Sequence, residues 1–325
     1  MREAAFVKKN KEKWKQFEEV LKGHQRQTPD RVSNLYIQLT DDLAYARTFF
    51  PESETVLYLN HLAMRVHQSI YKNKRERSGR ILSFWKYELP LLFYKHRKQF
   101  LYAFLIFVGA MLIGVVSSIY DENFARLILG DRYVNMTIEN IEKGDPMAVY
   151  KSRGQVDMFF AITYNNVRVS FYAFILGIFF SIGTGYILLL NGIMVGCFQY
   201  FFYGYGLLLE SFLTIWIHGT IEISSIVIAG GSGMVMGNSF LFPGTLPRWH
   251  SLKKGARDGL KIVIGLVPLF IIAGFLESFV TRLTEFPIAI KIGIILLSAV
   301  FIILYVVVYP SYIANRKPFS DDAQT

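Results

Sequence analysis

The chain has 325 residues, of which 52% are apolar and only 18% are charged, and its formal net charge is +10. Water-soluble proteins carry about a quarter charged residues, and here the deficit is concentrated in long uncharged runs, which excludes an ordinary soluble fold. The single cysteine, Cys197, excludes a disulfide framework and a cysteine-based metal site. We therefore expect an all-α, polytopic transmembrane helical bundle, preceded by a helical region that faces the cytoplasm.

The first region, residues 1–80, is predicted to form amphipathic helices in the cytoplasm. Its apolar side chains recur at the three- and four-residue spacing that defines one face of a helix. They are Phe6, Trp14, Phe17, Val20 and Leu21, then Leu35, Leu39, Leu43 and Ala46, then Val56, Leu59, Leu62, Val66 and Ile70. The basic stretch 72–80 is predicted to be a linker. We expect no cleavable signal peptide, because this charged region precedes the first apolar run.

Most of the positive charge lies ahead of the first apolar run. Residues 1–98 contain 20 Lys and Arg against 11 Asp and Glu. Beside a membrane, such a segment follows the positive-inside bias and contacts anionic lipid, so we expect membrane lipids, and no nucleic acid, as its partner. Residues 81–98 mix aromatic and charged side chains around Pro90, which predicts a kinked, amphipathic segment at the membrane interface.

About six transmembrane helices are predicted within residues 99–315, because a bilayer core is crossed by about 20 apolar residues. The predicted spans are 100–120, 168–188, 192–209, 211–239, 260–281 and 288–309. The run 192–209 is short and could instead be re-entrant.

Loop charges orient the predicted spans. The loop 247–261 contains five Lys and Arg and one Asp, whereas the segment 121–155 contains five basic and six acidic residues. The positive-inside rule then places 247–261 and the tail 316–325 in the cytoplasm, and 121–155 outside the membrane. Both termini are therefore predicted to be cytoplasmic.

His218 and Glu222 are the most distinct pair of ionisable residues within the apolar runs. Ionisable groups at bilayer depth are costly and need a structural or functional reason. A four-residue spacing places the two side chains on one helix face, one turn apart. There they could share a metal ion or relay protons, or form a buried hydrogen-bonded pair that fixes helix packing. No third metal ligand and no HExxH pattern is evident, so we expect no cofactor and treat the metal role as open.

Other polar residues could converge with this pair into one intramembrane site. We consider Asn166, Arg168, Asn191 and Glu277 as candidates, with Arg168 alternatively reaching the interface and Glu277 alternatively reaching head groups or pairing with Arg282. Small residues let helices approach closely, and a second set of positions is therefore predicted to be structural. These glycines are Gly183, Gly192, Gly196, Gly219, Gly230 and Gly233.

The order of these residues resembles the stage II sporulation protein M family. The similarity rests on a series of separated positions, of which the His-Gly-x-x-Glu block at 218–222 is the most specific. The others are Asn166, Gly177, Gly183, Thr184, Asn191, Gly192, Gly196, Gly230, Gly233 and Glu277. Residues 47–71, with Pro51, Asn60 and His67, resemble longer members that carry a cytoplasmic helical region.

The resemblance implies a bacterial inner-membrane protein that acts within a complex. In sporulating bacteria the family's namesake is associated with peptidoglycan-degrading enzymes that drive engulfment. Two hypotheses follow for this chain. It is either a non-enzymatic scaffold that recruits protein partners and could self-associate into a homo-oligomer, or a transporter, channel or intramembrane hydrolase that uses His218 and Glu222.

Overall fold

The computed structural model describes residues 2–21, 29–72, 79–151, 154–283 and 286–316, and the regular secondary structure within these residues is helical throughout. The chain divides into two compact units, Met1–Arg80 and Ile81–Thr325. The predicted all-α fold is confirmed. The linker prediction for 72–80 falls mainly on residues outside those described.

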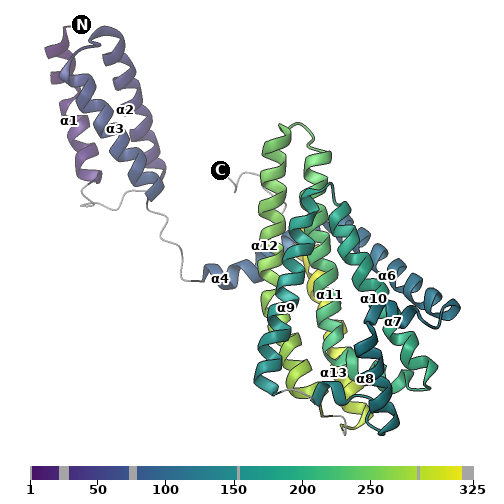
Figure 1. Cartoon of the computed structure of the whole chain (residues 1–325). Coiled ribbons are helices and arrows are strands. Elements are labelled where there is room, and N and C mark those ends of the chain that lie inside the picture. The colour runs from purple at the N-terminus through teal and green to yellow at the C-terminus, as the bar shows by residue number, and fades with distance from the viewer. Residues whose placement is uncertain (1, 22–28, 73–78, 152–153, 284–285, 317–325) are drawn as a thin grey trace. The chain divides into compact units, whose positions relative to one another are not determined.

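The first unit is a bundle of three helices that lie side by side (Figure 1), α1 (Glu3–Leu21), α2 (Pro29–Phe49) and α3 (Glu54–Lys72). Each helix contributes apolar side chains from its expected face, and among the described side chains the buried core contains Phe6, Trp14, Phe17, Leu39, Leu43, Ala46, Leu59, Leu62, Ala63 and Val66. Trp14 Nε1 also donates a hydrogen bond to Asp42 Oδ2 at 2.8 Å. These residues form a hydrophobic core that belongs to this unit alone. Burial of such aromatic and aliphatic side chains is the main favourable contribution to the free energy of folding.

The second unit contains five helices that are long and apolar enough, by length and composition, to cross a membrane within the described residues. They are α6 (Arg97–Tyr120), α10 (Ile182–Gly204), α11 (Leu208–Leu241), α12 (Arg248–Phe275) continued by η4 (Leu276–Thr281), and α13 (Ile288–Ile303) continued by η5 (Leu304–Val308) and α14 (Tyr309–Arg316). The central helix is α11, which contacts α6, α9, α10, α12 and α13 (Figure 1). A helical membrane bundle is thus confirmed.

The predicted span 168–188 does not exist as one helix. α9 (Gln155–Ile175) ends in the short 3-10 helix η3 (Leu176–Ile178), and the chain then turns before α10 begins. Phe180 and Ser181 adopt left-handed backbone conformations, with φ of +54° and +67°. A helix cannot continue through such residues, so the turn lies about ten residues earlier than the sequence suggested. Of the predicted span 192–209, residues 192–204 form the second part of α10, and the chain turns before α11 begins at Leu208.

Glycine lets α9, α10 and α11 approach closely. A Cβ atom on Gly233 of α11 would lie 2.3 Å from Thr184 Oγ1 and 2.4 Å from the Ala173 carbonyl oxygen, and one on Gly230 would lie 2.6 Å from Leu188. Thr184 Oγ1 already donates a hydrogen bond to that Ala173 oxygen at 2.6 Å. Side chains larger than hydrogen are therefore excluded where the three helices meet.

The same packing joins α10 to α6. A Cβ atom on Gly192 would lie 2.6 Å from the Phe107 carbonyl oxygen, and one on Gly196 would lie 2.0 Å from the Met111 carbonyl oxygen. Gly183 packs instead against the Leu176 carbonyl oxygen of η3. Close approach at these positions fixes the helices that carry the polar residues described below.

The predicted cytoplasmic loop 247–261 is helical from Arg248 onward, as the first half of α12. Asp258 is buried there, 2% exposed, with Lys95 Nζ at 2.8 Å and His96 Nε2 at 3.0 Å from Oδ2. A buried carboxylate needs such partners. The segment is therefore not a loop, because its basic, polar sequence continues the apolar part of α12 as one helix with its one acid paired.

The segment 81–98 forms the end of α4 (Arg80–Ser83), η1 (Phe84–Glu88), α5 (Leu89–Lys95) and the start of α6. Leu89, Leu92 and Phe93 are buried in the main core of the second unit, with α12 side chains such as Ile262 and Leu266. Pro90 lies at the start of α5, directly after the π-helical turn of η1, and it contributes no backbone N–H to this continuous helical segment. Placement of this segment at a membrane interface stays a prediction.

The segment 121–155 contains α7 (Phe124–Leu129), α8 (Asp131–Glu142) and η2 (Ala148–Lys151). Val134 and Thr137 of α8 and Met147 ahead of η2 are buried. α7 contacts α10, and η2 contacts η4. The segment therefore packs onto one end of the bundle, where α6 and α10 end and α9 and α11 begin.

Candidate intramembrane site

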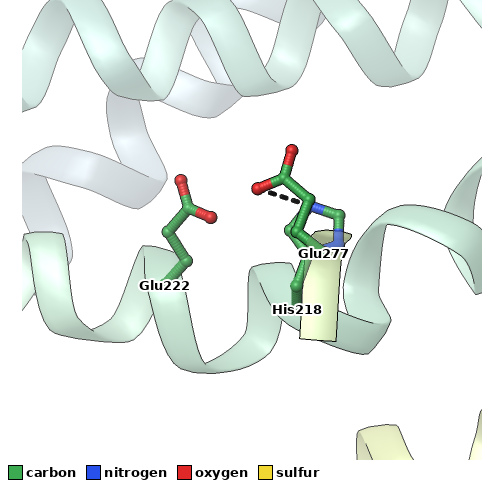
Figure 2. Close-up of side chains that lie close together, drawn as sticks. All are labelled: His218, Glu222 and Glu277. Atoms are coloured by element: carbon green, nitrogen blue, oxygen red, sulfur yellow. Dashed lines mark ion pairs between the residues drawn. The ribbon is translucent and has the colours of Figure 1, made fainter. Parts of the chain in front are cut away.

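Three ionisable side chains from two segments meet inside the second unit. His218 and Glu222 project in the same direction from α11, one turn apart, and Glu277 of η4 reaches toward the imidazole (Figure 2). Glu277 Oε2 lies 3.9 Å from His218 Nε2. One potential ligand atom from each residue lies within 4.8 Å of the other two. The sequence suggested the helical spacing of His218 and Glu222 and named Glu277 as a candidate to join them, and the structure places all three together.

The imidazole of His218 is oriented by a second contact on its other nitrogen. Nδ1 lies 2.9 Å from Thr281 Oγ1, and both residues are buried. Because Nδ1 is engaged by the hydroxyl, Nε2 is the nitrogen that faces Glu277. A hydrogen bond to one ring nitrogen commonly sets the role of the other.

Tyr150 covers the imidazole from the segment 121–155. Its ring centroid lies 5.8 Å from that of His218, with an interplanar angle of 61°. Burial, reinforced by the neighbouring carboxyl group of Glu277, raises the pKa of the Tyr150 phenol well above its ordinary value. Tyr150 therefore stays neutral at physiological pH and can act as a hydrogen-bond donor beside the carboxyl groups.

His218 and Glu222 line a cavity of about 390 Å³. α11 contributes Trp216 and Gly219 as well, and α9 contributes Asn165 and Asn166. The remaining lining residues come from α6, α9, α10, α11 and the segment 121–155. They are Phe107, Ile128, Leu129, Tyr133, Tyr150, Val169, Asn191, Met194, Val195, Phe198, Gln199, Ile215, Ile223 and Ile226. The cavity is thus mainly apolar, with polar groups concentrated around His218 and Glu222.

Several polar atoms of the cavity wall have no hydrogen-bond partner in the described structure. They are Asn166 Nδ2, Glu222 Oε2, Gln199 Oε1 and Trp216 Nε1. The Asn166 side chain is within reach of the Glu222 carboxyl group for a side-chain hydrogen bond, but Asn166 Nδ2 and Glu222 Oε2 have no partner at full hydrogen-bond geometry. A buried polar group without a partner costs about 1–3 kcal/mol. This arrangement is typical of a site that receives a ligand, an ion or water.

The charges of the cavity wall are unbalanced. Glu222 lines it and Glu277 lies beside it, while no Lys or Arg is among its lining residues in the described part of the chain. Two buried carboxylates without a compensating cation are strongly disfavoured. The site therefore either retains protons on its carboxyl groups or binds a cation.

The structure does not bring all predicted site residues together. Arg168 is exposed on α9, with its guanidinium 5.8 Å from the Tyr172 ring centroid, and it does not line the cavity. Asn191 lines the cavity, but its amide donates to the Ile187 carbonyl oxygen of its own helix at 2.8 Å instead of to another helix. Glu277 faces His218, whereas Arg282 donates to the Lys151 carbonyl oxygen at 3.1 Å.

Gly219 differs from the other predicted structural glycines. A Cβ atom there would meet only Ile215 and Ile223 of its own helix, each at 3.6 Å. Gly219 lines the cavity, so a side chain at this position would enter the cavity and not a helix contact.

Sequence reasoning missed Tyr133, Tyr150 and Thr281. The two tyrosines lie in the segment 121–155, and its balanced charge was interpreted only as an indication of which side of the membrane it occupies. Thr281 follows Glu277 by four residues, and this helical spacing was the signal that could have identified it. The amphipathic pattern of α8, whose tyrosine faces the cavity, was the one signal available for this wall.

Comparison with known families covers both units. Residues 103–282, more than half of the chain, match the family described as Stage II sporulation protein M, and residues 4–72 match a domain of unknown function (DUF8413). Searches of curated proteins and of solved structures gave no match. The first match contains all three residues of the cluster, His218, Glu222 and Glu277, together with the glycine contacts among α6, α9, α10 and α11. The chain is a membrane protein that belongs to the stage II sporulation protein M family.

Proposed function

We propose that this protein is a subunit of a bacterial inner-membrane complex linked to cell-envelope remodelling, in which it acts as a scaffold. The observation that carries the proposal is the division of the chain into two units, each with its own hydrophobic core. The membrane unit holds the protein in the bilayer. The first unit, which matches a domain family separately from the membrane unit, is available to recruit a partner.

The proposed membrane topology has six spans, with α9 as the sixth. α9 has 21 residues, which corresponds to about 31 Å and matches a bilayer core of about 30 Å. Large apolar and aromatic side chains are exposed along its length at Val156, Phe160, Tyr164, Tyr172 and Ile175. The exposed polar residues Gln155 and Asp157 lie in its first turn, whereas Asn165 and Arg168 lie near its middle. With α9 inserted, both termini lie in the cytoplasm and the segment 121–155 lies outside.

Leu57 and Met64 of α3 are the proposed centre of the partner surface. They are 71% and 50% exposed, and their seven-residue spacing places them on one helix face, two turns apart. Exposed apolar side chains on a small basic unit are suited to contact a protein.

Affinity purification from the native host tests the scaffold. The full-length protein is expected to recover stable partners, and a Leu57→Glu, Met64→Glu double variant is expected to lose them without losing membrane abundance. Ile37→Glu, at an exposed apolar position of α2 (54% exposed), is the matched control and should retain the partners. Recovery of the wild-type protein alone would contradict a scaffold role.

The cavity favours a second candidate function, transport or intramembrane hydrolysis at His218 and Glu222. The specific observation is the group of unpartnered polar atoms that surrounds Glu222. Under this alternative, Glu222→Gln abolishes function in the host while the variant is still recovered in the membrane in folded form and with its partners. Under the scaffold proposal, the same variant retains function as long as it folds.

A further inference from the structure

We propose that His218, Glu222 and Glu277 bind one divalent transition-metal ion, with zinc as the best match. The inference goes beyond the scaffold role and does not depend on it. Imidazole and carboxylate groups are established zinc ligands, and open zinc sites use three protein ligands plus one exchangeable position. The three side chains supply one nitrogen and two carboxylate ligands from two segments of the fold.

The distances fit a site that closes around an ion. Bonds of about 2.0–2.2 Å in tetrahedral geometry place neighbouring ligand atoms about 3.3 Å apart. The Nε2 atom of His218 and Oε2 of Glu277 are separated by 3.9 Å, and all three ligand atoms lie within 4.8 Å of one another. Small rotations of the two glutamate side chains would bring the oxygens to bonding distance, without movement of the helices.

Thr281 supports the proposal as an orienting residue. Histidine ligands of metals usually donate their second ring N–H to a nearby acceptor, which fixes the ring and its tautomer. The Thr281 hydroxyl lies 2.9 Å from His218 Nδ1 and can accept this hydrogen bond. Nε2 is then unprotonated and faces the carboxyl groups, as metal binding requires.

The surroundings provide independent support. The side chain of Asn166 is 95% buried, because the residue is 5% exposed, and its Nδ2 atom has no hydrogen-bond partner beside Glu222. A water or other molecule in the fourth coordination position would lie in the cavity and could accept this hydrogen bond. A divalent cation would also neutralise two carboxylates that no Lys or Arg of the cavity wall balances. The cluster thus combines two carboxylates without a balancing cation, an adjoining cavity and an unpartnered N–H donor on Asn166. Each of these features fits a bound cation.

Zinc titration of the full-length protein tests the inference. The protein, purified in detergent with a tag that lacks histidine, is stripped with a chelator and titrated with Zn²⁺. One ion per chain is expected. Glu222→Gln, Glu277→Gln and His218→Gln should each lower the affinity at least tenfold, and Thr281→Val should lower it about 10–100-fold. Glu210→Gln, at an exposed position near the start of α11, is the matched control and should bind like the wild type.

A second measurement uses only the wild-type protein, so it does not depend on the folding of any variant. Co²⁺ added to the stripped wild-type protein should give visible absorption that saturates at one equivalent and lacks a thiolate band, because Cys197 is not among the ligands. Failure of the wild type to bind Zn²⁺ stoichiometrically, a thiolate band, or unchanged affinity in folded glutamine variants would overturn the inference. Partner recovery in the purification described above is unaffected by any of these results, so the two proposals fail separately.

Discussion

The Nε2 atom of His218 lies 3.9 Å from Oε2 of Glu277, although one residue belongs to α11 and the other to η4 at the end of α12. Nδ1 of the same imidazole contacts Thr281, one turn beyond Glu277. A single ring therefore connects α11 to the segment that continues α12. Any change in the relative position of α11 and η4 would alter the polar site directly.

Replacement of Gly233 by alanine should destabilise the protein. The new Cβ atom would lie 2.3 Å from Thr184 Oγ1 and 2.4 Å from the Ala173 carbonyl oxygen, so α9 or α10 must shift. Overpacking of this kind costs about 1–3 kcal/mol. A lower unfolding midpoint in detergent, measured by thermal denaturation, is the expected result.

Gly219→Ala is the matched control on the same helix. Its Cβ atom would meet only side chains of α11 at 3.6 Å, and alanine favours a helix over glycine by about 1 kcal/mol. The midpoint should therefore stay equal or rise. Equal destabilisation by both substitutions would mean that the glycine contacts between helices do not determine stability.

Asp258→Asn should lower stability by about 2 kcal/mol, because Lys95 and His96 would lose the buried carboxylate that they contact. The side chain of Lys95 is 26% exposed, which keeps the loss below that of a fully buried pair. Glu88→Gln provides the comparison. Glu88 pairs with Lys261 from a position 44% exposed, and such pairs contribute at most about 1 kcal/mol. Chemical denaturation in detergent that ranks Glu88→Gln as the more damaging change would contradict this assignment.

Cysteine labelling should locate the two ends of the bundle. Cys197 is fully buried, so the wild-type protein provides a low background. With α9 as a span, Glu142→Cys in α8 is labelled by an impermeant maleimide in spheroplasts, whereas Trp249→Cys at the start of α12 is labelled only after permeabilisation. If α9 does not cross the membrane, the order of the later helices reverses and Trp249→Cys becomes reactive from outside.

The stability of the first unit should fall in alkaline solution through Tyr58. Its hydroxyl donates to Glu18 Oε1 at 3.0 Å, and partial burial together with this carboxylate raises the pKa of Tyr58 to about 12. Because the folded pKa lies above the ordinary value of 10.0, the contribution is complete below pH 10 and is lost as pH rises toward 12. Tyr58→Phe should show a smaller decrease than the wild type when thermal unfolding is measured across this range.

The helical class and one face of the site followed from local patterns. The apolar spacing of α1–α3 predicted their buried faces, and the spacing of His218 and Glu222 placed them together, because both features depend only on helical periodicity. Glu277, Thr281 and Tyr150 join the site through tertiary packing, which a pattern within one helix does not specify.

The predicted boundaries of the membrane helices were wrong for a different reason. Residues 169–209 contain no charged side chain, so hydropathy gives no sign of where the chain turns. The turn depends on left-handed conformations at Phe180 and Ser181, and these residues rarely mark such positions. The cluster of Gly177, Ser181, Gly183 and Gly185 was the available signal, although glycines in a membrane helix equally indicate close packing.

Among the described residues, η5 and α14 at the end of the membrane unit contact elements at its beginning. The Tyr305 hydroxyl donates to the Trp85 carbonyl oxygen at 2.7 Å, and the Tyr309 hydroxyl donates to the Lys86 carbonyl oxygen at 3.0 Å. Both oxygens belong to η1, so α14 and the start of the unit are neighbours in space. A fold whose first and last elements touch is a suitable substrate for circular permutation. In such a permutant a short peptide would join these two elements, and the chain would be opened between α11 and α12. The helices would then be synthesised in a different order but would occupy the same positions in the bundle.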